Sequence, residues 1–173
     1  QHSLVTVDTN GQEIARTEGF YPNSPYDGGD SVVILGDDIL FTANHELIRY
    51  NPREGRVIWR TSINGSLLAP TVTKEIVAVA RNPYAQDGRT MTFVEAANGR
   101  VRLQADAATA VREPVAIGDD SFVAVSYSKK QVAWRGLLAV PERVVLPHDE
   151  KVFDMVSLAD GVAVARTKNG LVW

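Results

Sequence analysis

The fold is decided by the stretch Ile48-Arg49-Tyr50-Asn51-Pro52-Arg53-Glu54-Gly55-Arg56-Val57-Ile58-Trp59, in which a glycine-bearing turn joins two strand-like runs. The same arrangement surrounds Gly11 and Gly99, so the three glycines lie 44 residues apart. A repeat in this length range is typical of β-propellers, in which each repeat supplies one blade. The sequence therefore predicts a repeat array whose blades start at these glycine turns.

A second kind of hairpin lies between the glycine turns. Polar turns at 36–38, 73–75, 118–120 and 159–161 each separate two short runs rich in β-branched residues, which is the pattern of a β-hairpin. The two kinds of turn together give about four strands per unit.

We expect one all-β propeller region over residues 1–173 with about four four-stranded blades, either small and closed or part of a larger propeller. The approximate units are 1–45, 46–90, 91–130 and 131–167, with the start of a further unit at 168–173. The fourth unit is irregular, because no glycine turn occurs near Arg143.

The composition excludes several classes of protein. With 45% hydrophobic and 23% charged residues, the 173-residue chain resembles an ordinary globular protein. A net charge of -3 with scattered basic residues argues against a nucleic-acid-binding face, which needs clustered Lys and Arg. The absence of cysteine removes disulfides, thiolate metal sites and cysteine nucleophiles. No apolar run approaches the roughly 20 residues of a membrane-spanning helix.

The unit around Gly55 resembles the repeat of quinoprotein-like (PQQ-like) β-propellers. In that family a Trp follows the turn glycine by four residues, and Gly55 with Trp59 matches this pattern literally. The other two units carry Ala15 and Leu103 at the Trp position. The resemblance implies a radial array of blades in which Trp59 and Gly55 form a structural interblade dock.

The family includes alcohol and sugar dehydrogenases that hold a quinone and calcium, and also non-catalytic scaffolds of the BamB type. The dehydrogenases often carry a vicinal cysteine pair, which this chain lacks. The resemblance therefore favours a scaffold without catalytic residues, cofactor or metal, which binds a protein partner. It also implies an extracytoplasmic location: periplasmic, secreted, or lipid-anchored through a segment preceding Gln1. A partial chain of a quinone- and calcium-dependent oxidoreductase and a small-ligand or sugar-binding propeller remain alternatives.

Two loop-like stretches, 19–30 and 81–89, interrupt the strand pattern. Loops at a propeller rim carry most of the variable binding chemistry, and tyrosine is favoured in the centres of interfaces. The sequence therefore predicts partner-binding loops with these candidate contact residues: Tyr21, Tyr26, Asp27, Asp30 and Tyr84.

Clustered aspartates are candidate calcium ligands, because calcium requires six to eight oxygen atoms. Tight turns account for the two Gly-Asp-Asp segments, which contain Asp37, Asp38, Asp119 and Asp120. A plain loop also accounts for the segment from Asp27 to Asp30. The three histidines, His2, His45 and His148, show no zinc-binding spacing.

Overall fold

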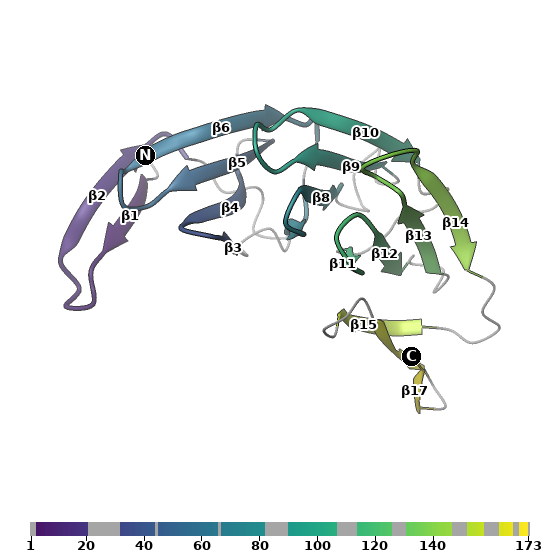
Figure 1. The fold of residues 1–173 in the computed structure, drawn as a ribbon. Helices are drawn as coiled ribbons and strands as arrows, with labels where there is room; N and C mark the ends of the chain where they lie inside the picture. Colours follow the sequence, from purple (N-terminus) through teal and green to yellow (C-terminus); the bar gives the residue numbers. More distant parts are fainter. Residues whose placement is uncertain are drawn as a thin grey trace.

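The computed structural model describes residues 3–20, 32–43, 45–65, 67–81, 90–106, 114–125, 131–146, 152–157, 163–167 and 170–172. All regular elements in these ranges are β-strands. They form antiparallel sheets that follow one another along the chain, and Figure 1 shows these sheets arranged as an arc. The prediction of an all-β propeller is confirmed. The described part of the chain has no helix of the length and apolar character needed to cross a membrane.

The N-terminal sheet pairs β1 (Ser3–Val7) with β2 (Glu13–Glu18). Three four-stranded sheets follow, each built in chain order from four strands. The first contains β3 (Val33–Leu35), β4 (Asp38–Ala43), β5 (Glu46–Asn51) and β6 (Arg56–Ser62). The second contains β7 (Thr71–Val72), β8 (Ile76–Ala80), β9 (Thr90–Glu95) and β10 (Val101–Asp106). The third contains β11 (Val115–Ala116), β12 (Phe122–Val125), β13 (Gln131–Arg135) and β14 (Glu142–Leu146). The last sheet has three described strands, β15 (Val152–Ser157), β16 (Ala163–Thr167) and β17 (Gly170–Val172).

The glycine turns do not start the blades, so this part of the prediction was wrong. Gly55 lies between β5 and β6, and Gly99 lies between β9 and β10, which are the third and fourth strands of their sheets. The unit boundaries predicted after residues 45, 90 and 130 accordingly fall inside sheets. A repeat period determines the spacing of the units but not their phase, because any cut through a periodic sequence has the same period. The hydrogen-bonded pairing of the strands decides the phase.

The fourth unit has a turn where the glycine spacing predicts none. Residues 136–141 join β13 to β14, and Gly136 adopts a φ of 64° at the start of this turn. Arg143, where the 44-residue spacing predicts the turn, instead lies in β14. The β13–β14 hairpin is therefore present, but its glycine lies at position 136 and not near position 143.

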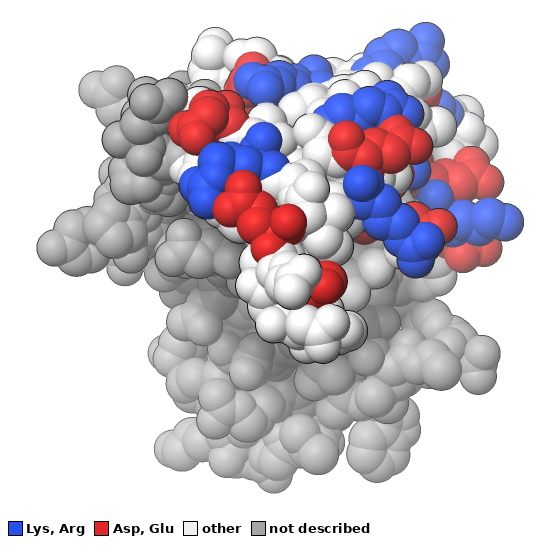
Figure 2. Space-filling view, turned by 90° about the vertical axis from the view of Figure 1, so that its left-hand side faces the viewer, with Lys and Arg blue, Asp and Glu red and all other residues white. Residues whose placement is uncertain are grey.

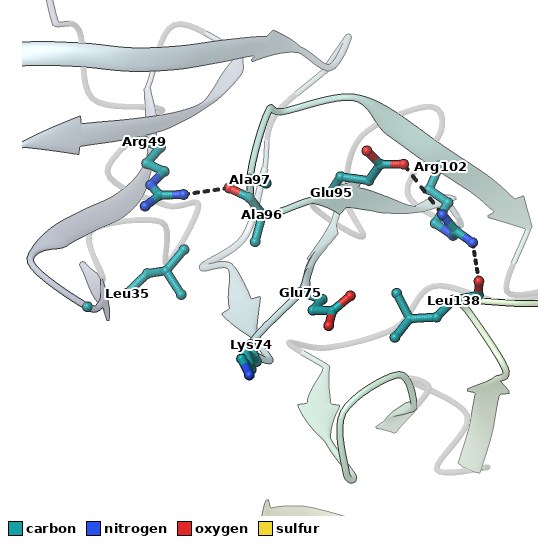
Figure 3. Close-up of a pocket in the computed structure, with 10 residues that line it drawn as sticks. Leu35, Arg49, Lys74, Glu75, Glu95, Ala96, Ala97, Arg102 and Leu138 are labelled. Atoms are coloured by element: carbon teal, nitrogen blue, oxygen red, sulfur yellow. Dashed lines mark hydrogen bonds and ion pairs between the residues drawn. The ribbon is translucent and has the colours of Figure 1, made fainter.

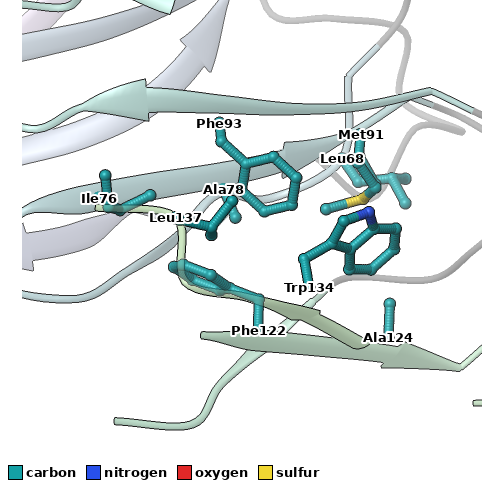
Figure 4. Close-up of a cluster of buried hydrophobic side chains, with 10 residues drawn as sticks. Leu68, Ile76, Ala78, Met91, Phe93, Phe122, Ala124, Trp134 and Leu137 are labelled. Atoms are coloured by element: carbon teal, nitrogen blue, oxygen red, sulfur yellow. The ribbon is translucent and has the colours of Figure 1, made fainter. Parts of the chain in front are cut away.

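The core consists of apolar layers between successive sheets. Every residue of β8 and of β12 is buried, as expected for a strand that is covered on both faces. Figure 4 shows the layer between the second and third four-stranded sheets, where the ring centres of Phe93 and Phe122 lie 5.7 Å apart. Trp134 is fully buried in the same layer, with its ring 5.6 Å from that of Phe93. These layers join neighbouring sheets and hold their turns at fixed positions.

Candidate functional site

Trp59 connects the first four-stranded sheet to the second. Its indole Nε1 donates a hydrogen bond to the carbonyl oxygen of Ala96 at 3.0 Å. Its ring also covers Gly99 so closely that a Cβ atom added there would lie 2.7 Å from Trp59 Cδ2. Two residues further along β6, Thr61 Oγ1 donates to the Gly99 carbonyl at 2.5 Å. The glycine turn of the second sheet is therefore a receptor for side chains of the preceding sheet.

The preceding interface repeats this arrangement around Gly55. Thr17 Oγ1 donates to the Gly55 carbonyl at 3.0 Å, and a Cβ on Gly55 would lie 2.9 Å from Ala15 Cβ. Residues four and six positions after one turn glycine thus pack on the next turn glycine. Trp59 and Gly55, which the resemblance groups into one dock, belong to two different interfaces: Trp59 contacts the following sheet, and Gly55 contacts the preceding one.

The third interface is built differently. Leu103 and Ala105 occupy the positions that hold Trp59 and Thr61 in the preceding unit. The guanidinium of Arg102 instead donates hydrogen bonds to the carbonyl oxygens of Leu137 and Leu138 in the β13–β14 turn. An arginine clamp on two carbonyls therefore connects the sheets where the turn glycine has moved.

A pocket of about 430 Å³ lies among the turns of the three four-stranded sheets, as Figure 3 shows. Each of these sheets contributes to it: the β3–β4 and β7–β8 turns, the β9–β10 turn, and the β13–β14 turn. The lining residues are Leu35, Gly36, Arg49, Lys74, Glu75, Glu95, Ala96, Ala97, Arg102 and Leu138. Its volume is within the range of small-ligand and side-chain pockets.

One cation of the pocket wall is neutralised within the wall. Arg49 donates to Asp38 Oδ2 through Nε at 2.7 Å, and its Nη2 lies 2.5 Å from the same oxygen. Its Nη1 donates to the carbonyl of Ala96 at 2.8 Å, which connects the first sheet to the second. Asn51 donates to the other carboxylate oxygen of Asp38 at 2.9 Å. Arg49 is thus held in one position by partners on both sides of the interface.

A second charge cluster surrounds Glu95 at the other end of the pocket. Arg100 Nη2 donates to Glu95 Oε1 at 2.5 Å, and Asn98 donates to Oε2 at 2.9 Å. The hydrogen bond from Arg100, followed by that from Asn98, holds the pKa of the Glu95 carboxyl below its usual value. Arg102 Nη1 lies 3.4 Å from the same Oε1, so Glu95 also orients the arginine clamp.

Lys74 and Glu75 differ from these engaged groups. Both are exposed, and within the described ranges neither side chain forms an ion pair or a hydrogen bond. Their backbone is nevertheless fixed: Thr73 Oγ1 accepts from the amide of Ile76 at 3.1 Å, and the Glu75 carbonyl accepts from the amide of Ala96 at 2.8 Å. The pocket therefore presents one free acid and one free base on a rigid frame.

Charges of both signs are also mixed elsewhere on the surface. Figure 2 shows Lys and Arg side chains interspersed with Asp and Glu on one face of the molecule. The ion pairs of the described residues include Arg16 with Glu13 at 2.6 Å and Arg60 with Glu46 at 3.6 Å. The face shown has no field of a single sign such as a polyanion would require.

The five predicted loop contacts, Tyr21, Tyr26, Asp27, Asp30 and Tyr84, lie outside the described residues. The strand ends that flank residues 82–89 are Arg81 and Thr90, at the end of the sheet opposite to the β9–β10 turn, because β8 and β9 are antiparallel. The pocket therefore lies at the other end of the sheets from these flanking residues. From the sequence, residues 73–75 form only a polar turn, and a single sequence contains no signal that would place that turn beside Ala96 and Leu138.

Three of the four aspartates of the Gly-Asp-Asp turns form an ion pair or hydrogen bond with a described residue of their own sheet. Asp37 lies 3.6 Å from Arg53, Asp38 is bound to Arg49, and Asp120 accepts from Ser121 Oγ at 3.0 Å. In the ranges that the structure describes, no three His, Asp or Glu side chains gather where they could hold a metal ion.

Solved structures share this fold. The chain is similar to the computationally designed Ika4 protein, with a TM-score of 0.66 and 16% identity over 94% of this chain and 96% of that one. It is also similar to BamB from Moraxella catarrhalis, with a TM-score of 0.60 and 14% identity over 93% of this chain and 49% of that one. For the computationally designed Ika8 protein the TM-score is 0.65 and the identity 15%, over 94% and 48% of the two chains. The chain thus spans about half the length of the BamB and Ika8 chains that it matches.

A comparison with curated proteins finds no significant match. The sequence profile of the family described as outer membrane protein assembly factor BamB, in contrast, matches residues 1–173. This match covers all the sheets described above, including those in which the Trp of the repeat is replaced. The chain therefore belongs to the BamB family of β-propellers with PQQ-like repeats.

Proposed function

We propose that this chain is a non-catalytic propeller scaffold that binds a protein partner and works outside the cytoplasm. The observation that carries the proposal is the turn-end pocket, which combines a fixed frame with the free side chains of Lys74 and Glu75. Family membership supports it further, because the family is described as an outer membrane assembly factor. Tyr21, Tyr26, Asp27, Asp30 and Tyr84 remain proposed partner contacts in a second region.

A rigid platform favours binding because little conformational freedom is lost when the partner associates. Successive sheets are joined by the contacts of Trp59 with Gly99 and of Thr17 with Gly55. The turns that surround the pocket are connected by Arg49 and Arg102. In this proposal Trp59 and Gly55 each act as an interblade dock, at two successive interfaces, and their contribution to function is structural.

Site-specific photo-crosslinking in the native host tests the proposal. A photoreactive residue at position 74 should give a discrete adduct with one partner protein. The control is position 64, since Asn64 is also exposed but follows β6 at the opposite end of the sheet. A third probe at position 84 tests the loop region that the sequence indicated.

The three positions distinguish the possible results. Adducts at position 84 alone would support protein binding through the loop region and would show that the pocket does not take part in it. The absence of adducts at all three positions would refute the scaffold function. Reduction of an electron-accepting dye after addition of pyrroloquinoline quinone and calcium would also refute it, in favour of the oxidoreductase alternative. Fractionation of cells that express the full-length protein tests the proposed location.

A further inference from the structure

The Glu75 carboxylate accepts no hydrogen bond from the described residues, and the two arginines of the pocket wall already have other partners. Arg49 is bound to Asp38 and to the Ala96 carbonyl, and Arg102 is bound to Glu95 and to the carbonyls of Leu137 and Leu138. Figure 3 shows Glu75 between Leu35 and Leu138, with its carboxylate inside the set of lining residues. The wall arginines therefore leave Glu75 without a cation, although it lies in a preformed recess.

Apolar side chains lie on both sides of this carboxylate. Leu35 comes from the end of β3 and Leu138 from the β13–β14 turn, and both line the pocket. Leu138 is 37% exposed, so an apolar side chain of a partner can reach it. The recess therefore combines one acid that has no partner among the described residues with an apolar residue on either side.

From this arrangement we propose that the pocket receives an arginine side chain from an extended segment of the protein partner, with an apolar residue two positions before and two positions after that arginine. The inference rests on the proposed scaffold function and specifies the chemistry of the partner. A guanidinium can donate two parallel hydrogen bonds to one carboxylate, which a lysine ammonium cannot do in the same geometry. Alternate side chains of an extended segment share one face, so these two apolar residues point the same way as the arginine and contact Leu35 and Leu138.

Lys74 sets the strength of this interaction. It lies next to Glu75 in sequence and lines the same pocket, so its positive charge repels the incoming guanidinium. Removal of the charge at position 74 should strengthen binding, whereas removal of the charge at position 75 should weaken it. The two substitutions should thus change the affinity in opposite directions. Loss of folding could not produce this result, because it would weaken binding in both variants.

The test uses the full-length protein and three acetylated and amidated nonapeptides that differ only in the central residue: Leu-Ser-Arg-Ser-Leu, Leu-Ser-Gln-Ser-Leu and Leu-Ser-Glu-Ser-Leu, flanked by Gly and Ser. Binding is measured by isothermal titration and by shifts of backbone amide signals in NMR spectra. We expect the Arg peptide to bind about tenfold more tightly than the Gln peptide, the size of one charge-assisted hydrogen-bonded pair. The amide signals of residues 74–76 and 96–97 should move.

Three variants complete the design. Glu75→Gln should lower the affinity for the Arg peptide about tenfold, and Lys74→Gln should raise it about two- to threefold. Glu54→Gln is the matched control, because Glu54 is an exposed acid in the β5–β6 turn that pairs with Arg56 and does not line the pocket. This variant should bind like the unmodified protein.

The inference is overturned by no binding of the Arg peptide, by equal affinities for the Arg and Glu peptides, or by an unchanged affinity in Glu75→Gln. In each of these cases crosslinks to a partner from position 74 or 84 would still support the scaffold function. Dye reduction with quinone and calcium would instead refute that function itself, so the two failures are distinguishable.

Discussion

Replacement of Gly99 by alanine should separate the cost of a backbone conformation from the cost of an interblade clash. Gly99 has a φ of 76°, and a side chain in this left-handed region costs about 1–2 kcal/mol. The new Cβ would also lie 2.7 and 2.8 Å from two carbons of the Trp59 ring and 2.9 Å from Thr61 Oγ1. Ordinary carbon contacts are about 3.5–4.0 Å, so the buried indole must move. Overpacking of this kind costs about 1–3 kcal/mol, which gives a total loss of about 2–5 kcal/mol for Gly99→Ala.

Gly11→Ala is the matched control. Gly11 has nearly the same φ, 79°, but no atom lies within 4 Å of the added Cβ. Its cost should therefore be only the backbone part, about 1–2 kcal/mol. Urea unfolding followed by circular dichroism gives the free energy of unfolding of both variants from the transition midpoint and slope. A difference between them smaller than about 0.5 kcal/mol would refute the assignment of the Gly99 contact.

A double-mutant cycle examines the same contact from the other side. In a Trp59→Leu background the ring that meets the new Cβ is gone and only the contact with Thr61 Oγ1 at 2.9 Å remains, so Gly99→Ala should cost less there than in the unmodified protein. Contacting residues typically show coupling energies of about 0.5–3 kcal/mol, and strictly additive losses here would contradict the packing argument.

Two further predictions concern single groups at the interfaces. Trp59→Phe removes the donor to the Ala96 carbonyl, but Arg49 still donates to that oxygen at 2.8 Å, so the loss should be about 1 kcal/mol. A loss as large as the roughly 3–5 kcal/mol expected for Trp59→Ala, in the same urea titration, would show that the hydrogen bond is essential. The hydrogen bond from Arg100 lowers the pKa of Glu95 in the folded protein. The ionised Glu95 therefore stabilises the fold fully above its unfolded-state pKa of about 4.3, and this stabilisation is lost as the pH falls through the lower folded-state pKa. Glu95→Gln should therefore make stability less dependent on pH below about 5, and parallel acid profiles of the two proteins would contradict this assignment.

Much of the fold was predictable because its signals are local. A turn with positive φ favours glycine in the immediate sequence, and Gly11, Gly55 and Gly99 all adopt such angles. Runs such as Ile76–Ala80 are apolar throughout because the strand is covered on both faces, and this too is visible without neighbours. The phase of the blades was wrong because it depends on which strands pair, and a periodic sequence does not contain that choice.

The candidate site was not predictable in the same way. The segment from Thr73 to Glu75 has the composition of an ordinary turn, and Leu138 belongs to another hairpin far along the chain. They line one pocket only because the sheets stack in sequence order, which places turns of successive sheets side by side.

By itself the sequence determined the repeat, the strand content and the position of the glycine turns, since each of these follows from interactions within a few residues. Only the tertiary structure decided that Trp59 covers Gly99, that Arg102 replaces this contact at the next interface, and that no cation among the described residues pairs with Glu75. The physical reason is that these contacts join residues of different sheets that lie far apart in the chain, 37 positions for Trp59 and Ala96 and 35 for Arg102 and Leu137, so they depend on how the sheets pack and not on local conformational preference.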